Sequence, residues 1–291
     1  MRRLVRFHLE KDSRLKVVGE ASSAEAARPM IKALNPDVLT LDVEMPGIGG
    51  ISFLGHLMRL RPMPVVMVSS LTQAGSDFAI QALSLGAVEC VAKPGIGKSS
   101  FSEDLAELVF QAAHSRQRPR NLQPSHQQSD KPGFSWNGKL LLIGASTGGV
   151  EALERVLSSF PPDCPPTLIS QHMPESFLRS FAKRLNDGMS ATVKLACDKE
   201  KLQKGHIYLA PGAERIARDV IAILLTGMGR DGAYGMKQLW QAGAHTIAQN
   251  EETSVVFGMP RVAIELGAVA DVLPLEAIAE CALSKCSRSV S

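Results

Sequence analysis

The chain has 291 residues, 45% of them hydrophobic and 21% charged, which is long enough for two ordinary globular domains. Its net charge of +3 is too small to argue for nucleic-acid binding or attraction to an anionic membrane. The five cysteines show no zinc-like CxxC pairing and are expected to be reduced thiols. The charged N-terminus does not have the pattern of a signal peptide, and no apolar stretch reaches membrane-spanning length. We therefore expect a cytoplasmic protein without direct membrane insertion.

The first half alternates short apolar runs with helical patterns, which is typical of a parallel α/β sheet. It opens in a helical pattern that carries Leu4, Phe7 and His8. Strands are predicted at residues 15–20, 37–42, 65–70 and 87–92. Helices are predicted at residues 23–34, 50–59, 74–85 and 102–114. Residues 1–115 are thus predicted to form the first domain.

Polar residues lie at the carboxyl ends of three of these strands: Asp42, Ser69 and Lys93. A single aspartate at a strand end is more often a turn former or a helix cap than a reactive group. Three such residues at successive strand ends are more informative, because the carboxyl ends of parallel strands form the ligand-binding edge of an open sheet.

The segments DVLTLDVEMPG, PVVMVSSLT and LGAVECVAKP closely resemble a response-regulator receiver domain. The resemblance implies that Asp42 accepts a phosphoryl group, that Ser69 is the switch hydroxyl and that Lys93 pairs with the phosphate. This is sensible chemistry, since a carboxylate can accept phosphate covalently and an ammonium group stabilises the added charge.

Receivers begin with an apolar strand that ends in an acidic pair for Mg²⁺, whereas this chain opens in what looks like the first helix. Glu10 and Asp12 are acidic but follow no strand. Magnesium needs several well-placed oxygens, and Asp42 with a backbone carbonyl supplies few. We expect an incomplete flavodoxin-like receiver with a poor Mg²⁺ site.

Residues 116–138 are rich in Arg, Gln, Pro and Ser and are predicted to be an interdomain linker. The second domain, residues 139–291, repeats the α/β alternation. Its strands are predicted at residues 139–145, 167–171, 206–210, 220–226 and 244–249. Its helices are predicted near residues 150–159, 174–186, 232–242 and 259–266.

Three strand ends of the second domain carry Ser146, His172 and Asp231. Each residue has an ordinary alternative: Ser146 as a helix cap, His172 as a turn residue, and Asp231 as a turn residue or cap. Together a hydroxyl, an imidazole and a carboxylate at one sheet edge favour a nucleophile, a base and an orienting group.

Two rival chemistries use the same glycines. GASTGG could cradle a dinucleotide phosphate, but it lacks G-x-G-x-x-G spacing, and the next strand ends in His172 instead of an acidic residue. GASTG also fits the elbow of α/β-hydrolases, whose order Ser, acid, His would select Asp231 and His245. His245 begins its strand, away from the active edge, so the order Ser146, His172, Asp231 fits better.

That order, with IGASTGGVEAL, ISQHMPESF, ILLTGMGRDGA and AGAHTIAQNEETSVVFGMPRVAIELGAV, closely resembles the chemotaxis protein-glutamate methylesterases. The resemblance implies hydrolysis of glutamate γ-methyl esters on chemoreceptors, with glutamine deamidation by the same route and no metal for the ester chemistry. It implies chemoreceptors as substrate and a chemotaxis histidine kinase as phosphodonor, with Mg²⁺ as the cofactor of receiver phosphorylation.

The resemblance also implies a role for each site residue. Ser146 would attack the ester carbonyl, His172 would transfer the proton, and Asp231 would orient the imidazole. Loop N–H groups, from Thr147, Gly148 and Met228, would bind the oxyanion.

The family carries a hairpin, an arginine-containing loop and a helix where this chain has only residues 211–219. A parallel crossover usually needs about a dozen residues or more. The resemblance therefore implies a methylesterase shortened inside its catalytic domain as well as at its receiver. The alternative is a catalytically inactive descendant that binds receptors or signalling partners.

Overall fold

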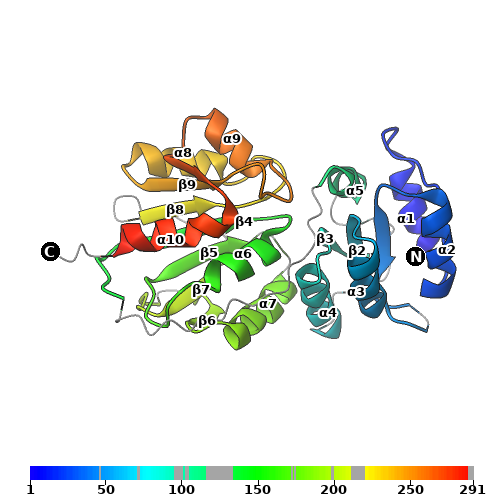
Figure 1. Ribbon diagram of the computed structural model, residues 1–291, viewed down its shortest axis with the longest axis horizontal. Helices are drawn as coiled ribbons and strands as arrows, with labels where there is room; N and C mark the ends of the chain where they lie inside the picture. Colours follow the sequence, from blue (N-terminus) through cyan, green and yellow to red (C-terminus); the bar gives the residue numbers. More distant parts are fainter. Residues whose placement is uncertain are drawn as a thin grey trace. The chain divides into compact units, whose positions relative to one another are not determined.

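The computed structural model describes residues 1–45, 47–70, 73–94, 101, 105–115, 134–171, 173, 175–197, 200–210 and 220–287. The chain divides into two compact units, residues 1–120 and 121–291 (Figure 1). Both are α/β units with parallel sheets, as the sequence predicts. None of the described helices is long and apolar enough to cross a membrane.

The first unit contains a three-stranded parallel sheet of order β1-β2-β3. Its strands are β1 (Leu39–Asp42), β2 (Val65–Ser69) and β3 (Glu89–Ala92). β2 is buried along its whole length, as expected for the β-branched run in the middle of the sheet. The three strands run in the same direction, so their carboxyl ends and the residues that follow share one edge.

The helices of the first unit are α1 (Arg2–Leu9), α2 (Ala24–Leu34), α3 (Gly50–Leu60), α4 (Gln73–Ser84) and α5 (Leu105–Ala113). α1 packs against α5 and α3 packs against α4, while α4 and α5 both contact the sheet. The side chain of Ser23 caps α2, accepting a hydrogen bond from the N–H of Ala26 at 3.3 Å.

The strand predicted at residues 15–20 is wrong, because these residues belong to no strand. In the flavodoxin-like order this segment would pair with a strand that lies beside β1. Among the described residues no strand lies on that side of β1, which pairs only with β2. An apolar alternation without a neighbouring ladder cannot satisfy its backbone groups as a strand.

The second unit contains a seven-stranded parallel sheet of order β10-β9-β8-β4-β5-β7-β6 (Figure 1). The strands are β4 (Leu140–Ala145), β5 (Thr167–Gln171), β6 (Thr192–Leu195), β7 (His206–Ala210), β8 (Val220–Leu224), β9 (His245–Gln249) and β10 (Asp271–Leu273). The sequence predicted five of them and missed the two edge strands, β6 and β10. Strand order reverses between β4 and β8, and this reversal is the place where open α/β sheets bind ligands.

The helices of the second unit are α6 (Gly149–Leu157), α7 (Glu175–Gly188), α8 (Ala233–Gln241), α9 (Met259–Glu265) and α10 (Leu275–Cys286). α6 packs against α10, which also contacts β8 and β9, while α8 packs against α9. α10 was not predicted. Of the predicted linker, residues 134–138 belong to the second unit, where the N–H of Asn137 donates to the carbonyl of Cys286.

Candidate active site

Ser146 directly follows β4, at the reversal of strand order between β4 and β8. Its side chain is buried, and its N–H donates to the carbonyl of Thr226, just beyond β8, at 3.2 Å. It does not cap α6, because the N-cap of that helix is Gly148 and no side chain bonds there. The cap alternative for Ser146 is therefore removed.

The loop after β4 is fixed by uncharged buried side chains. The hydroxyl of Thr226 donates to the carbonyl of Thr147 at 3.1 Å and accepts from the N–H of Val256 at 2.9 Å. The side-chain amide of Gln171 donates to the carbonyl of Ser146 at 3.0 Å. These bonds hold the loop against the ends of β5 and β8, which gives Ser146 a defined position.

A second amide supports this arrangement from the end of β9. The Gln249 carbonyl oxygen accepts from the N–H of Thr226 at 2.7 Å, and its amide nitrogen donates to the carbonyl of Thr253 at 2.8 Å. Gln249 is fully buried. Thr226, Gln171 and Gln249 were not predicted as site residues. The signal available in the sequence was the same strand-end placement that selected Ser146.

Glycines allow close approach around the serine. Gly148 has a φ of 77°, and a Cβ there would lie 2.7 Å from the Cβ of Val255. A Cβ on Gly227 would lie 2.8 Å from the Cβ of Ser146 and would overlap the sulfur of Met259. The glycines therefore serve the tight packing of this loop as well as its turn.

Three backbone N–H groups near Ser146 remain available as donors. Among the described residues, the N–H groups of Thr147, Gly148 and Met228 donate to no protein acceptor. Thr147 and Gly148 lie at the N-terminal end of α6, where the helix dipole favours negative charge. The arrangement can stabilise an anion that forms at a substrate bound to Ser146.

Asp231 lies exposed in the turn between β8 and α8. It does not cap α8, whose N-cap is Gly232 with no side-chain bond. His172 lies outside the described residues, so its predicted contacts with Ser146 and Asp231 stay predictions. His245, the rival histidine, begins β9 and pairs with Asp271 at 2.7 Å instead of with Asp231. This pairing argues against the α/β-hydrolase order.

The first unit brings its predicted residues to one sheet edge. The ammonium of Lys93 lies 2.8 Å from a carboxylate oxygen of Asp42, and its backbone N–H donates to the carbonyl of Ser69 at 2.7 Å. Ser69 itself is fully buried. Burial alone would lower the pKa of Lys93, but hydrogen bonds with Asp42 and Glu44 outweigh it, and the pKa is raised.

Glu44 is a member of this group that the sequence analysis missed. Its carboxylate accepts from Lys93 at 2.8 Å and from the hydroxyl of Ser70 at 2.8 Å. The bond from Lys93, and then the bond from Ser70, hold the pKa of Glu44 below its usual value. In the sequence, the available signal for Glu44 was its position two residues after Asp42.

The residues around Asp42 do not fit a Mg²⁺ ion. Among the described residues, no cluster of three ligand-type side chains includes Asp42. One Asp42 oxygen already pairs with Lys93 and accepts from the N–H of Glu44. Asp12, one of the two acidic residues that follow α1, is paired with Arg14, which holds the pKa of Asp12 at about 2.

Both units of the chain match known protein families. Residues 141–218 and 212–282 match the CheB methylesterase family, and residues 1–100 match the response regulator receiver domain. A protein-glutamate methylesterase/protein-glutamine glutaminase of Agrobacterium fabrum is 45% identical over 96% of this chain and 92% of its own length. A protein of the same name from Salmonella typhimurium is 42% identical over 99% of this chain and 94% of its own.

Among solved structures, the Thermotoga maritima CheB methylesterase catalytic domain is 33% identical, with a TM-score of 0.48. The match covers 50% of the present chain and 98% of the Thermotoga maritima chain. The fold, the buried serine loop and the matched families define a response regulator joined to a hydrolase. The chain belongs to the protein-glutamate methylesterase/protein-glutamine glutaminase family.

The comparison also bears on the shortened segment. The alignment with the Agrobacterium fabrum protein runs over 322 positions, more than the 291 residues of this chain, so that relative carries residues that are missing here. The two methylesterase matches overlap at residues 212–218, inside the segment 211–219. The length of the alignment does not place the missing residues, so the shortening at residues 211–219 stays a prediction.

Proposed function

We propose that this chain hydrolyses γ-methyl esters of glutamate side chains on chemoreceptors and deamidates receptor glutamine by the same route. The observation that carries the proposal is the loop after β4: a buried serine, held by side-chain hydrogen bonds, beside backbone N–H groups that have no acceptor among the described residues. Family membership supplies the substrate class.

In this mechanism the hydroxyl oxygen of Ser146 attacks the ester carbonyl, and His172 takes the hydroxyl proton. The N–H groups of Thr147, Gly148 and Met228 stabilise the oxyanion, each donor contributing about 3 kcal/mol. His172 then protonates the departing methoxide, which leaves as methanol. Water hydrolyses the acyl-enzyme to glutamate and free Ser146, while Asp231 holds the imidazole in the required tautomer.

The receiver would regulate this activity by phosphoryl transfer from a chemotaxis kinase to Asp42, with Lys93 and Ser69 responding to the new charge. The ion pair between Lys93 and Asp42 supports these roles, because an added phosphoryl group would change the charge that Lys93 contacts. The poor fit of Mg²⁺ argues that this chain is phosphorylated slowly.

Methanol release from methylated receptor by the purified protein tests the proposed reaction. Ser146→Ala should reduce release to background, and Asp231→Asn should lower kcat by about 10⁴-fold. Ser158→Ala, which changes an exposed serine at the other end of α6, is the matched control and should keep full activity. Equal release by the wild-type protein and Ser146→Ala would favour the inactive binding protein instead.

A further inference from the structure

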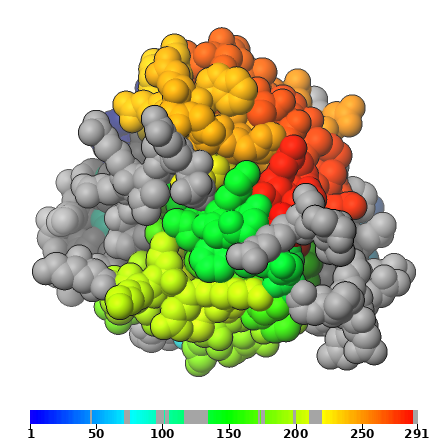
Figure 2. All heavy atoms as spheres, turned by 90° about the vertical axis from the view of Figure 1, so that its left-hand side faces the viewer, coloured from blue at the N-terminus to red at the C-terminus, as the bar shows by residue number. Residues whose placement is uncertain are grey.

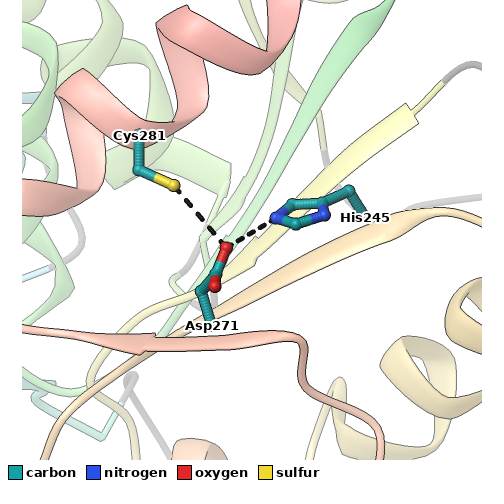
Figure 3. A group of neighbouring side chains, drawn as sticks. All are labelled: His245, Asp271 and Cys281. Carbon is teal, nitrogen blue, oxygen red and sulfur yellow. Dashed lines mark hydrogen bonds and ion pairs between the residues drawn. The ribbon is translucent and has the colours of Figure 1, made fainter.

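A second group of reactive side chains lies in the catalytic unit, apart from the serine loop. His245 begins β9, Asp271 begins β10 and Cys281 lies in α10. Figure 3 shows the three side chains pointing toward one another from these three elements. His245 and Asp271 lie at the amino ends of their strands, whereas Ser146 follows the carboxyl end of β4. The proposed reaction uses none of the three.

The three ligand-type atoms are close enough to share one ion. One nitrogen of His245, one oxygen of Asp271 and the sulfur of Cys281 all lie within 4.8 Å of one another. This is the single such group among the residues that the structure describes. All three side chains are partly exposed, so an ion can reach them from solvent.

The spacing between Cys281 and Asp271 suits a tetrahedral centre. With bonds of about 2.0–2.3 Å, a tetrahedral zinc ion holds its ligand atoms about 3.3–3.6 Å apart. The Cys281 sulfur lies 3.7 Å from Oδ2 of Asp271, close to that range. Nε2 of His245 lies 2.7 Å from the same oxygen, so the ring must move back by about half an ångström when the shared proton is replaced by a metal.

We propose that His245, Asp271 and Cys281 bind a zinc-type divalent cation, with water as the fourth ligand. A nitrogen, oxygen and sulfur donor set is typical of zinc, whereas Mg²⁺ and Ca²⁺ require oxygen ligands. On binding, the Cys281 thiol loses its proton to solvent, and the imidazole binds through Nε2 with its proton on Nδ1. The thiolate and the carboxylate together balance the charge of the cation.

The cation would join three segments of the catalytic unit. β10 is an edge strand of three residues that pairs only with β9, so few ladder bonds hold it. In Figure 2 the C-terminal helix, in red, borders the orange segment that precedes it in the sequence. A metal bridging β9, β10 and α10 would stabilise this edge of the sheet without contacting the serine loop. Its predicted effect is therefore on stability.

Cobalt substitution tests the site without relying on enzyme activity. Full-length protein, treated with a chelator, reduced and desalted, should give a thiolate-to-cobalt charge-transfer band in the near ultraviolet on addition of Co²⁺. The band should saturate at about one equivalent and disappear when Zn²⁺ is added. Zn²⁺ should also raise the melting temperature.

Three variants make the test specific. Cys281→Ser should lose the band and the thermal shift, and His245→Gln should weaken Co²⁺ binding by about tenfold or more. Cys197→Ser changes an exposed cysteine outside the cluster and should keep both signals. Circular dichroism and methanol release check that each variant is folded.

The proposal is overturned if the wild-type protein gives no band, or if Cys281→Ser keeps the band. In either case the three residues form a metal-free hydrogen-bonded group. Neither result would bear on Ser146, because the methylesterase reaction is measured separately.

Discussion

Gly227 and Ser146 approach each other so closely that a Cβ on the glycine would lie 2.8 Å from the Cβ of the serine. The N–H of Gly227 donates to the carbonyl of Val256 at 3.1 Å, and its carbonyl accepts from the N–H of Met259 at 2.9 Å. The glycine backbone is thus fixed by hydrogen bonds while it lies against Ser146. A methyl group can enter only if the Met259 side chain moves away and either Ser146 or the glycine backbone also shifts.

Gly227→Ala should therefore displace Ser146 and lower the rate of methanol release by about 10²-fold, the cost of a misplacement of about 1 Å. Overpacking should reduce the free energy of unfolding by about 1–3 kcal/mol. Urea unfolding and methanol release measure the two effects.

Gly235→Ala is the control, because a Cβ there meets nothing within 4 Å. Since Gly235 lies inside α8, this change should raise the free energy of unfolding by about 0.5–1 kcal/mol. Unchanged activity in Gly227→Ala would show that the serine tolerates this movement.

Thr226 offers a test of the hydrogen bonds that hold the loop. Thr226→Val keeps the shape but removes the acceptor of the Val256 N–H and the donor to Thr147. Leaving buried backbone groups unpaired should lower the free energy of unfolding by about 1–3 kcal/mol. Thr226→Ser retains the hydroxyl and should lose less. Wild-type stability of Thr226→Val in urea unfolding, with a loss only in Thr226→Ser, would mean that the methyl group, and not the hydroxyl, is what matters.

The Lys93–Glu44 pair predicts a pH effect in the receiver. The pKa of Glu44 is lowered in the folded chain, so its contribution to stability is present above the ordinary glutamate pKa. It is lost as the pH falls through the lowered value. Lys93→Met should move the pKa of Glu44 upward, and Ser70→Ala should move it upward by less. Carboxyl NMR titration measures the shift, and an unchanged Glu44 pKa in Lys93→Met would contradict the assigned cause.

The geometry at Asp42 predicts weak phosphorylation. Because the surrounding described residues do not fit Mg²⁺, incubation with acetyl phosphate and Mg²⁺ should give no stable acid-labile adduct. Intact-protein mass spectrometry at neutral pH, with Asp42→Asn as the control, makes the measurement. An adduct of the wild-type protein that Asp42→Asn abolishes would show that the receiver binds magnesium after all.

Much of the fold was predictable because buried parallel strands are short apolar runs with polar residues at their ends. β2, β4 and β8 have this pattern, and each was predicted within two residues at either end. The edge strands β6 and β10 were missed, since edge segments are short and less apolar. The segment 15–20 shows the opposite error: it has strand-like alternation but no neighbouring strand among the described residues.

The candidate site was predictable only in part, because strand ends can be read from sequence but contacts across the sheet cannot. Ser146 and Asp42 were selected as candidates from their positions at strand ends. Gln249 bonds to Thr226 across 23 positions of the chain, and Glu44 bonds to Lys93 across 49. These partners depend on strand order, which the sequence pattern alone did not establish.

The described side chains that anchor the serine loop are all uncharged: Gln171, Thr226 and Gln249. None of them gains or loses a proton between acidic and alkaline conditions, and mobile ions do not screen bonds between buried neutral groups. The loop should therefore keep its geometry across a wide range of acidity and ionic strength. A pH–rate profile of this enzyme would then report the imidazole of His172, the proposed base, without distortion from loosening of the loop that holds Ser146, the proposed nucleophile.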